Sequence, residues 1–309
     1  IIADSDDSYD LGELPKFLDA LKRGADFVIG TRYRRGGGKV ERGAMPFLHY
    51  WLGTPVLSAL ARLFFGTKIT DINCGMRGFR REALDRMSLQ MTGMEIASEM
   101  VIKSSLLGLT TAEVPITLRP AGRARAPHLR TWRDGWRHLR VLLLFSPRWL
   151  FVIPGLLLAG IGAAGLVVLA PGPLYVGDVE FDTNTMLIAS LILILGSQLV
   201  LLGVFAKSFV VAERLLPGSG LDRVGRALRL EAGIGAGLVL AAVGTALILW
   251  AIWLWKQSGF GPLESTSATR LVVFGTTFIV LGIQLASAGF FLGVLHLRRK
   301  GHADGDDSP

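Results

Sequence analysis

The chain has 309 residues, of which 50% are hydrophobic, and it carries a formal net charge of +8 at pH 7. This composition is too apolar for an ordinary soluble domain. A basic excess suits either nucleic acid or anionic lipid, and beside long apolar segments it favours lipid, so no nucleic-acid partner is expected. The one cysteine, Cys74, excludes an internal disulfide.

Residues 1–118 alternate between predicted strands and predicted helices. Residues 1–3 read as the end of a strand already under way, which predicts that an earlier part of the domain precedes residue 1. The hydrophobic pattern predicts strands at 26–30 and 111–118, and helices from residue 10 and at 46–65, 80–87 and 94–107. Segments 33–43 and 71–79 are predicted loops, the first of them mobile. This alternation indicates an α/β layer domain.

Two pairs of polar residues have the spacing of helix capping boxes. Asp10 with Glu13, and Thr92 with Glu95, each place an acceptor at a helix start and an acid three residues later. Glu99 follows Glu95 by one helical turn. Its side chain either faces a sugar or merely solvates its helix, and the sequence leaves both interpretations open.

Residues 119–148 are strongly basic, with eight Arg and a single acid, Asp134. A helix with a Trp/Leu face beside an Arg face lies in the headgroup layer of a membrane. His128 and His138 fall on this predicted helix and are expected to be interfacial. The apolar residues recur at helical spacing and the arginines repeat it one residue later: Leu129, Trp132, Trp136, Leu139 and Leu143, then Arg130, Arg133, Arg137 and Arg140.

Four apolar runs follow, at 149–170, 186–206, 232–255 and 271–295. None contains Asp, Glu, Lys or Arg, and each is long enough to cross the roughly 30 Å of a bilayer core. Arginines gather before the first run, in the connector 213–230 and in the tail, which places both chain ends and the soluble domain in the cytoplasm. The predicted domains are therefore 1–118, 119–148, 149–297 and a polar cytoplasmic tail, 298–309.

An acidic pair, Asp4 and Asp6, closes the first predicted strand. Ligands of α/β sheets sit at the carboxyl ends of strands, where two such carboxylates can bind a divalent cation that in turn holds a diphosphate. A solvated acidic loop that caps the next helix is an equally good interpretation of the spacing alone.

An ordered set of motifs carries more weight than any one of them. DSDDSYD, GTRY, D-x-x-x-G-x-R-x-F at 71–79, GMEIASEM and EVPI precede the basic segment. This set resembles the family 2 glycosyltransferases that charge a polyprenyl phosphate, the relatives of dolichyl-phosphate mannose synthase, over roughly residues 1–149. The resemblance implies a partial GT-A (Rossmann-like) domain, of which 1–118 is the C-terminal part. It also implies transfer of a sugar from a nucleotide sugar to undecaprenyl or dolichyl phosphate at the cytoplasmic face, with inversion.

The resemblance also implies roles for particular residues. Asp4 and Asp6 would hold Mg²⁺ or Mn²⁺ and the donor diphosphate, and Arg32 would meet the donor phosphates. Asp71 and Arg77 match the acceptor-side loop; a turn residue and a structural ion pair are the alternatives for these two. The catalytic set is then Asp6, Arg32 and Asp71, and the acceptor phosphate would be bound by Arg77, Arg119, Arg123 and Arg125.

The chain departs from the family pattern in two places. Relatives often carry an Arg on the acceptor side where this chain has His49 and Tyr50. The family's first strands, which hold the nucleotide base and ribose, do not occur within residues 1–309, so this chain alone is expected to be inactive.

Two other functions compete with this one. A polysaccharide synthase shares the fold but usually carries a Q-x-x-R-W segment, which is absent here. A non-catalytic membrane scaffold with a decayed domain is the second. The expected location is a bacterial plasma (inner) membrane in preference to the endoplasmic reticulum, and the sequence leaves the oligomeric state open, homo-oligomers included.

Overall fold

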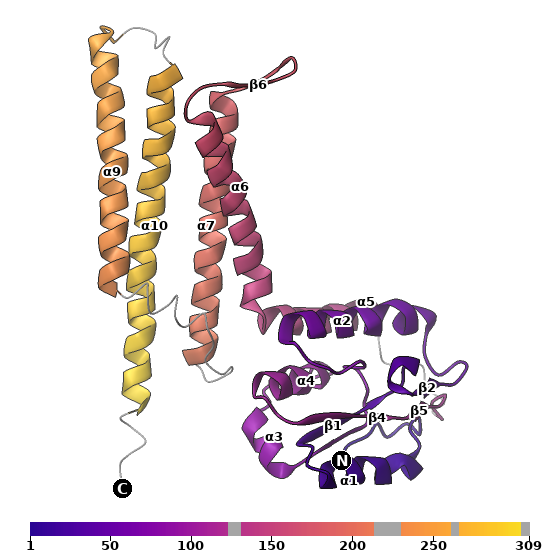
Figure 1. The fold of residues 1–309 in the computed structure, drawn as a ribbon. Helices are drawn as coiled ribbons and strands as arrows, with labels where there is room; N and C mark the ends of the chain where they lie inside the picture. The colour runs from indigo at the N-terminus through magenta and orange to yellow at the C-terminus, as the bar shows by residue number, and fades with distance from the viewer. Residues whose placement is uncertain (123–130, 213–229, 261–265, 304–309) are drawn as a thin grey trace. The chain divides into compact units, whose positions relative to one another are not determined.

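The computed structural model describes residues 1–122, 131–212, 230–260 and 266–303. The chain forms two compact units, Ile1–Ser146 (unit 1) and Pro147–Pro309 (unit 2). Unit 1 is built on a mixed sheet, and unit 2 contains long helices (Figure 1).

The central sheet of unit 1 has the strand order β3-β1-β4. Strand β1 (Phe27–Thr31) runs parallel to β4 (Thr111–Pro115) and antiparallel to β3 (Arg77–Phe79). Ile2 pairs antiparallel with Arg77 on the other side of β3, so the chain at Ile2 runs in the same direction as β1 and β4. The carboxyl ends of these three segments therefore lie at one edge of the sheet, where Asp4 and Arg32 follow.

Helices cover both faces of this sheet (Figure 1). All five residues of β1 are buried. Helix α1 (Leu14–Lys22) packs on one face through the buried side chains of Phe17 and Ala20. Helix α4 (Ile96–Leu106) lies over the other face, and α2 (Thr54–Phe65) and α5 (Thr131–Leu144) contact both α4 and each other. The predicted α/β layer domain is confirmed.

The structure corrects two predicted loops and one predicted strand. Segment 71–79 contains β3, which was missed because Arg-Gly-Phe is too short to show alternation. Segment 33–43 contains a 3-10 turn, η2 (Arg34–Gly36), and strand β2 (Lys39–Val40). The predicted strand 111–118 is divided into β4 and β5 (Thr117–Leu118), and β5 pairs with β2 in a second sheet. Helix α3 (Arg81–Met87) matches its prediction.

The capping predictions are only partly correct. The Oδ1 atom of Asp10 accepts the Gly12 N–H at 2.9 Å and caps the turn η1 (Leu11–Glu13). Glu13 instead accepts the Thr117 N–H at 3.1 Å, so it ties the turn to β5. Glu95 stands at the start of α4 without a side-chain capping bond, and its Oε2 atom is buried with no hydrogen-bond partner.

Glu99 fulfils neither of its two predicted roles. Its side chain is fully buried and accepts the backbone N–H groups of Gln90 and Met91. It also pairs with Lys103, 2.8 Å away and one turn along α4. A buried charge that is both paired and hydrogen-bonded is tolerable inside a protein. Through its bonds to Gln90 and Met91, Glu99 fixes the loop between α3 and α4.

Among its described residues, unit 2 contains four helices that are long and apolar enough to cross a membrane. They are α6 (Ile153–Leu169), which follows the π-helical turn η4 (Arg148–Val152), α7 (Thr183–Ala212), α9 (Leu230–Gln257) and α10 (Thr266–Ala303). A hairpin of β6 (Leu174–Val176) and β7 (Val179–Phe181) joins α6 to α7. The four predicted spans are confirmed, and the helices extend beyond the apolar runs at several ends.

These helices pack as neighbours in the order α6, α7, α10, α9. Hydroxyl and amide groups link α7 to α10: Ser190 and Thr277 lie 2.6 Å apart, and Ser197 donates to Gln284 at 2.9 Å. At one end of the unit, Arg270 of α10 donates to the Leu169 carbonyl of α6. Its guanidinium also pairs with Asp182, just before α7.

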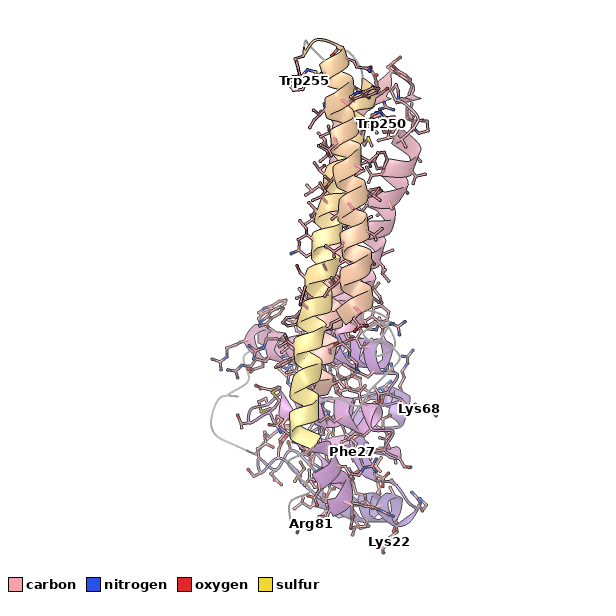
Figure 2. The ribbon with its side chains drawn as sticks, turned by 90° about the vertical axis from the view of Figure 1, so that its left-hand side faces the viewer. Lys22, Phe27, Lys68, Arg81, Trp250 and Trp255 are labelled. Atoms are coloured by element: carbon pink, nitrogen blue, oxygen red, sulfur yellow. The ribbon has the colours of Figure 1, made fainter. Side chains whose placement is uncertain are left out.

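Tryptophans mark one end of α9. Trp250, Trp253 and Trp255 are all exposed, and Figure 2 shows Trp250 and Trp255 near the same end of the α9–α10 pair. Aromatic residues are enriched where spans meet the headgroup layer. This end of α9 is therefore expected at a membrane–water interface.

Close approach of α6 and α7 depends on glycine. A Cβ atom at Gly162 would collide with the Leu193 amide and the Ala189 carbonyl, whereas one at Gly160 would meet nothing within 4 Å. We therefore expect Gly162→Leu to lower the free energy of unfolding of unit 2 by about 1–3 kcal/mol through overpacking. Gly160→Leu, on the same helix, should leave the unfolding temperature in detergent nearly unchanged; equal losses in the two variants would contradict this helix contact.

Candidate active site

A cavity of about 320 Å³ lies within unit 1. It lies where the carboxyl-end edge of the sheet meets the helices η3 (His49–Gly53), α2 and α5, and polar side chains from both sides line it. The lining residues used below are Asp4, Asp6, Arg32, His49, Asp134 and His138.

The two acids of the DSD motif both line this cavity. The Oδ1 atom of Asp6 accepts hydrogen bonds from the Ser8 hydroxyl at 2.5 Å and the Ser8 N–H at 3.2 Å. The Asp6 carbonyl accepts the Gly122 N–H at 3.0 Å. The carboxylate of Asp4 rests against Gly75, where any Cβ atom would collide with it. Hydrogen bonds from Ser8 and Gly122 therefore hold Asp6 in place. The Asp4 carboxylate fits beside residue 75 because that residue is glycine.

Arg32 and Asp71 form a buried bidentate ion pair. Arg32 Nε lies 2.7 Å from Asp71 Oδ2, and Nη2 lies 2.8 Å from Oδ1. The Arg32 N–H also donates to Oδ2 at 3.2 Å. The Arg32 side chain is 9% exposed and lines the cavity, whereas Asp71 is fully buried behind it. Asp71 thus positions the guanidinium; it does not itself line the cavity, so the geometry does not support its predicted place in the catalytic set.

The structure does not support the predicted contact of Arg77 with the acceptor phosphate. Arg77 is 2% exposed and donates to three backbone carbonyls, those of Ile72, Cys74 and Ala97, at 2.5 to 2.8 Å. Burial lowers the pKa of its guanidinium to about 10, so it stays protonated at neutral pH. Arg77 therefore braces the loop between α2 and β3 against the start of α4, closer to the structural alternative than to an acceptor site.

The basic residues predicted to fold over the site divide into two groups. Arg119 is exposed and pairs with Asp10 at 2.6 Å, while its N–H donates to the Ser8 carbonyl. It therefore lies next to the DSD loop without lining the cavity. Arg123 and Arg125 lie outside the described residues.

Helix α5 contributes two lining residues whose inward position the sequence did not predict. Asp134 and His138 are 7% exposed, and Ser98 Oγ lies 2.8 Å from His138 Nδ1. His138 was expected at the membrane interface, yet it faces into unit 1, and burial lowers its pKa. The signal that could have found the pair is their i, i+4 spacing, which puts the segment's one acid and a histidine on the same helix face.

The opposite face of α5 is apolar and exposed. Trp132 is 80% exposed and Trp136 is 59% exposed. The neighbouring helices η3 and α2 and the residues just before them expose further large side chains, including Phe47 and Trp51. The two tryptophans of the predicted Trp/Leu stripe are thus exposed, as a helix in a headgroup layer requires, whereas Leu139 and Leu143 are half-buried and Leu129 lies outside the described residues.

A metal ion held by Asp4 and Asp6 would take its other ligands from water or from the substrate. No group of three or more His, Cys, Asp or Glu residues suited to a metal occurs among the described residues. Asp4 and Asp6 supply carboxylate oxygens, the ligands that Mg²⁺ prefers, and Mg²⁺ usually keeps waters or substrate phosphates as its other ligands. The acid pair therefore fits a cation held jointly with a diphosphate.

Two regions of the chain match known protein families. Residues 1–88 match the glycosyl transferase family 2 domain, and residues 204–296 match the glycosyltransferase family 2 C-terminal transmembrane region. Together with the four apolar helices, the second match identifies an integral membrane protein.

Several curated proteins are similar to this chain. The low-salt glycan biosynthesis hexosyltransferase Agl6 of Haloferax volcanii is 35% identical over 95% of this chain and 69% of its own length. A dolichyl-phosphate hexose transferase of the same organism is 35% identical over 38% of this chain, and the undecaprenyl-phosphate mannosyltransferase of Micrococcus luteus is 33% identical over 37%. The chain spans less than half the length of each of these last two relatives. The resemblance predicted from the motifs is confirmed, and the chain belongs to glycosyltransferase family 2.

Proposed function

We propose that this protein transfers a hexose from a nucleotide sugar to a polyprenyl phosphate, undecaprenyl or dolichyl, in the membrane. The observation that carries the proposal is the cavity shared by Asp4, Asp6 and Arg32 at the carboxyl-end edge of the sheet. The names of the relatives point to the same class of acceptor, since two of them are transferases that act on dolichyl or undecaprenyl phosphate.

The site's charges suit a reaction between two phosphates. The acceptor oxygen of a lipid phosphate is already ionised near neutral pH, so the reaction requires no strong general base. The obstacle is the mutual repulsion of two anions and the departure of a nucleoside diphosphate. Arg32 is held rigidly by Asp71, and a preorganised guanidinium can stabilise the diphosphate as its charge grows. One in-line displacement would invert the anomeric carbon.

The acid pair supports a metal-dependent reaction. Family 2 enzymes generally use a divalent metal ion, and we propose Mg²⁺ or Mn²⁺ here, held by Asp4 and Asp6. When bound, such an ion neutralises the charge of the leaving diphosphate. Ser8 keeps one Asp6 oxygen in place through two hydrogen bonds, which orients the carboxylate toward the cavity.

The membrane side of the proposal rests on α5 and its neighbours. The exposed Trp132, Trp136 and Trp51 form an apolar surface that suits the headgroup layer. The positive charge of the connectors supports our proposal that unit 1 lies in the cytoplasm, and a bacterial plasma membrane is the proposed location. Arg119, with Arg123 and Arg125, is proposed to meet the acceptor phosphate.

A transfer assay tests this function. The full-length protein in membranes is incubated with labelled UDP-glucose, UDP-galactose or GDP-mannose, with undecaprenyl or dolichyl phosphate, and with Mg²⁺ or Mn²⁺. Label should pass into the organic phase with one donor and should require both lipid phosphate and metal. Label in a water-soluble polymer would indicate a polysaccharide synthase instead, and no transfer from any donor would favour the scaffold.

A further inference from the structure

The cavity has a second polar side that the reaction above does not use. Asp4, Asp6 and Arg32 come from the ends of the strands. Asp134 and His138 come from α5, and they line the same cavity. Both α5 residues are buried, each with 7% of its surface exposed, so they serve this interior space in spite of the helix's exposed outer face.

Asp134 is chemically unsuited to bind a phosphate. An ionised carboxylate only accepts hydrogen bonds, and it repels the phosphates of both proposed substrates. Arg133 and Arg137 lie 3.9 and 3.7 Å from its Oδ1 atom, and both of these arginines are themselves substantially exposed. Beside these contacts a carboxylate can accept further hydrogen bonds, and the hydroxyls of a hexose are neutral donors that can supply them.

His138 complements this carboxylate. Its Nδ1 atom is engaged by Ser98 Oγ at 2.8 Å, which holds the ring in one orientation. Burial is the largest cause of its lowered pKa, so the imidazole is neutral near pH 7. A neutral ring has one donor and one acceptor nitrogen, and with Nδ1 engaged by Ser98 the Nε2 atom can bond to a sugar hydroxyl in either tautomer.

We propose that Asp134 and His138 bind the hydroxyls of the transferred hexose and so select which sugar the enzyme accepts. This assignment rests on the proposed function, because it places the diphosphate at Asp4, Asp6 and Arg32. The hexose is bonded directly to that diphosphate, so it must occupy the adjoining space, which α5 bounds. A cavity that hydrogen-bonds particular hydroxyls rejects epimers lacking them, because its buried polar groups are then left unpaired.

The test compares Asp134→Asn and His138→Gln with a matched control, Asp85→Asn, at an exposed position of α3. Each variant is made in the full-length protein and assayed in membranes with UDP-glucose, UDP-galactose and GDP-mannose, and free UDP and GDP are measured as competitors. For the preferred donor, kcat/KM should fall about 10- to 100-fold in Asp134→Asn, and less in His138→Gln. The preference among the three sugars should narrow in both, with Asp85→Asn unchanged.

The competitors separate the hexose from the rest of the donor. Inhibition by free UDP or GDP should stay at the wild-type level in both α5 variants, because these nucleotides lack the hexose. Weaker inhibition would place Asp134 and His138 at the ribose or diphosphate and would overturn the assignment. Wild-type sugar preference and kcat/KM in both variants would overturn it as well, while transfer by the wild type would still uphold the proposed function. Absence of transfer by the wild type itself would refute that function.

Discussion

Asp71→Ala is expected to lower the free energy of unfolding of unit 1 by about 3–5 kcal/mol, because it leaves the buried Arg32 guanidinium without its partner. Asp71 is fully buried and receives two side-chain hydrogen bonds and one backbone bond from Arg32. Pulse proteolysis of the membrane-inserted protein in increasing urea measures this loss. Transfer should fall at the same time, because Arg32 loses the contact that orients it.

A double variant separates the two effects. Arg32→Met with Asp71→Leu replaces the buried pair with apolar side chains of similar volume, a change that is often neutral or stabilising. Stability should largely return, whereas transfer should not, since the cavity then has no cation at this position. Full transfer by the double variant would show that Arg32 takes no part in the reaction, and wild-type stability of Asp71→Ala would show that the pair is not buried as described.

Asp6→Asn should reduce sugar transfer about 100- to 1,000-fold without unfolding unit 1. An asparagine oxygen can still accept the two hydrogen bonds from Ser8, so the loop keeps its shape while the negative charge is lost. The variant should also need more Mn²⁺ or Mg²⁺ for its residual activity. Initial rates over a metal titration measure both effects.

The neighbouring residue provides the control for this substitution. Asp7 is exposed and has a φ of 61°, a left-handed conformation that asparagine tolerates well. Asp7→Asn removes the same charge one residue away and should keep near-normal transfer and metal requirement. Equal losses in the two variants would point to the total charge of the loop, and near-normal turnover in Asp6→Asn would remove the proposed role of Asp6 in metal binding.

The sequence best predicted the place of residues that directly follow a strand. Asp4 and Asp6 follow a strand segment by fixed spacing, and Arg32 follows β1 directly, so chain order alone brought them to one edge of the sheet. The four membrane spans were equally predictable from the sequence, because few structures other than a membrane-spanning helix suit a long apolar run. Whether Asp4 and Asp6 hold a metal stays a prediction.

The sequence failed where tertiary contacts decide a side chain's role. Arg77 looks like a surface or phosphate-binding cation, yet it is enclosed by three carbonyls, two from the loop before β3 and one from α4. His138 lies in a helix full of arginines, and only the rotation of that helix on α4 turns it inward. Strand β3 is formed because β1 offers it an edge, which three residues of local pattern could not reveal.

The glycine contacts of unit 2 bear on how the protein is made. Gly162 and Gly196 bring α6 and α7 into backbone contact, and Gly244 and Gly275 do the same for α9 and α10. Between these two pairs, α7 and α10 meet through Ser190, Thr277, Ser197 and Gln284. During biogenesis each pair can therefore leave the translocon as a preassembled hairpin. The second hairpin would then dock laterally onto the first, guided by the hydroxyl and amide groups that link α7 to α10.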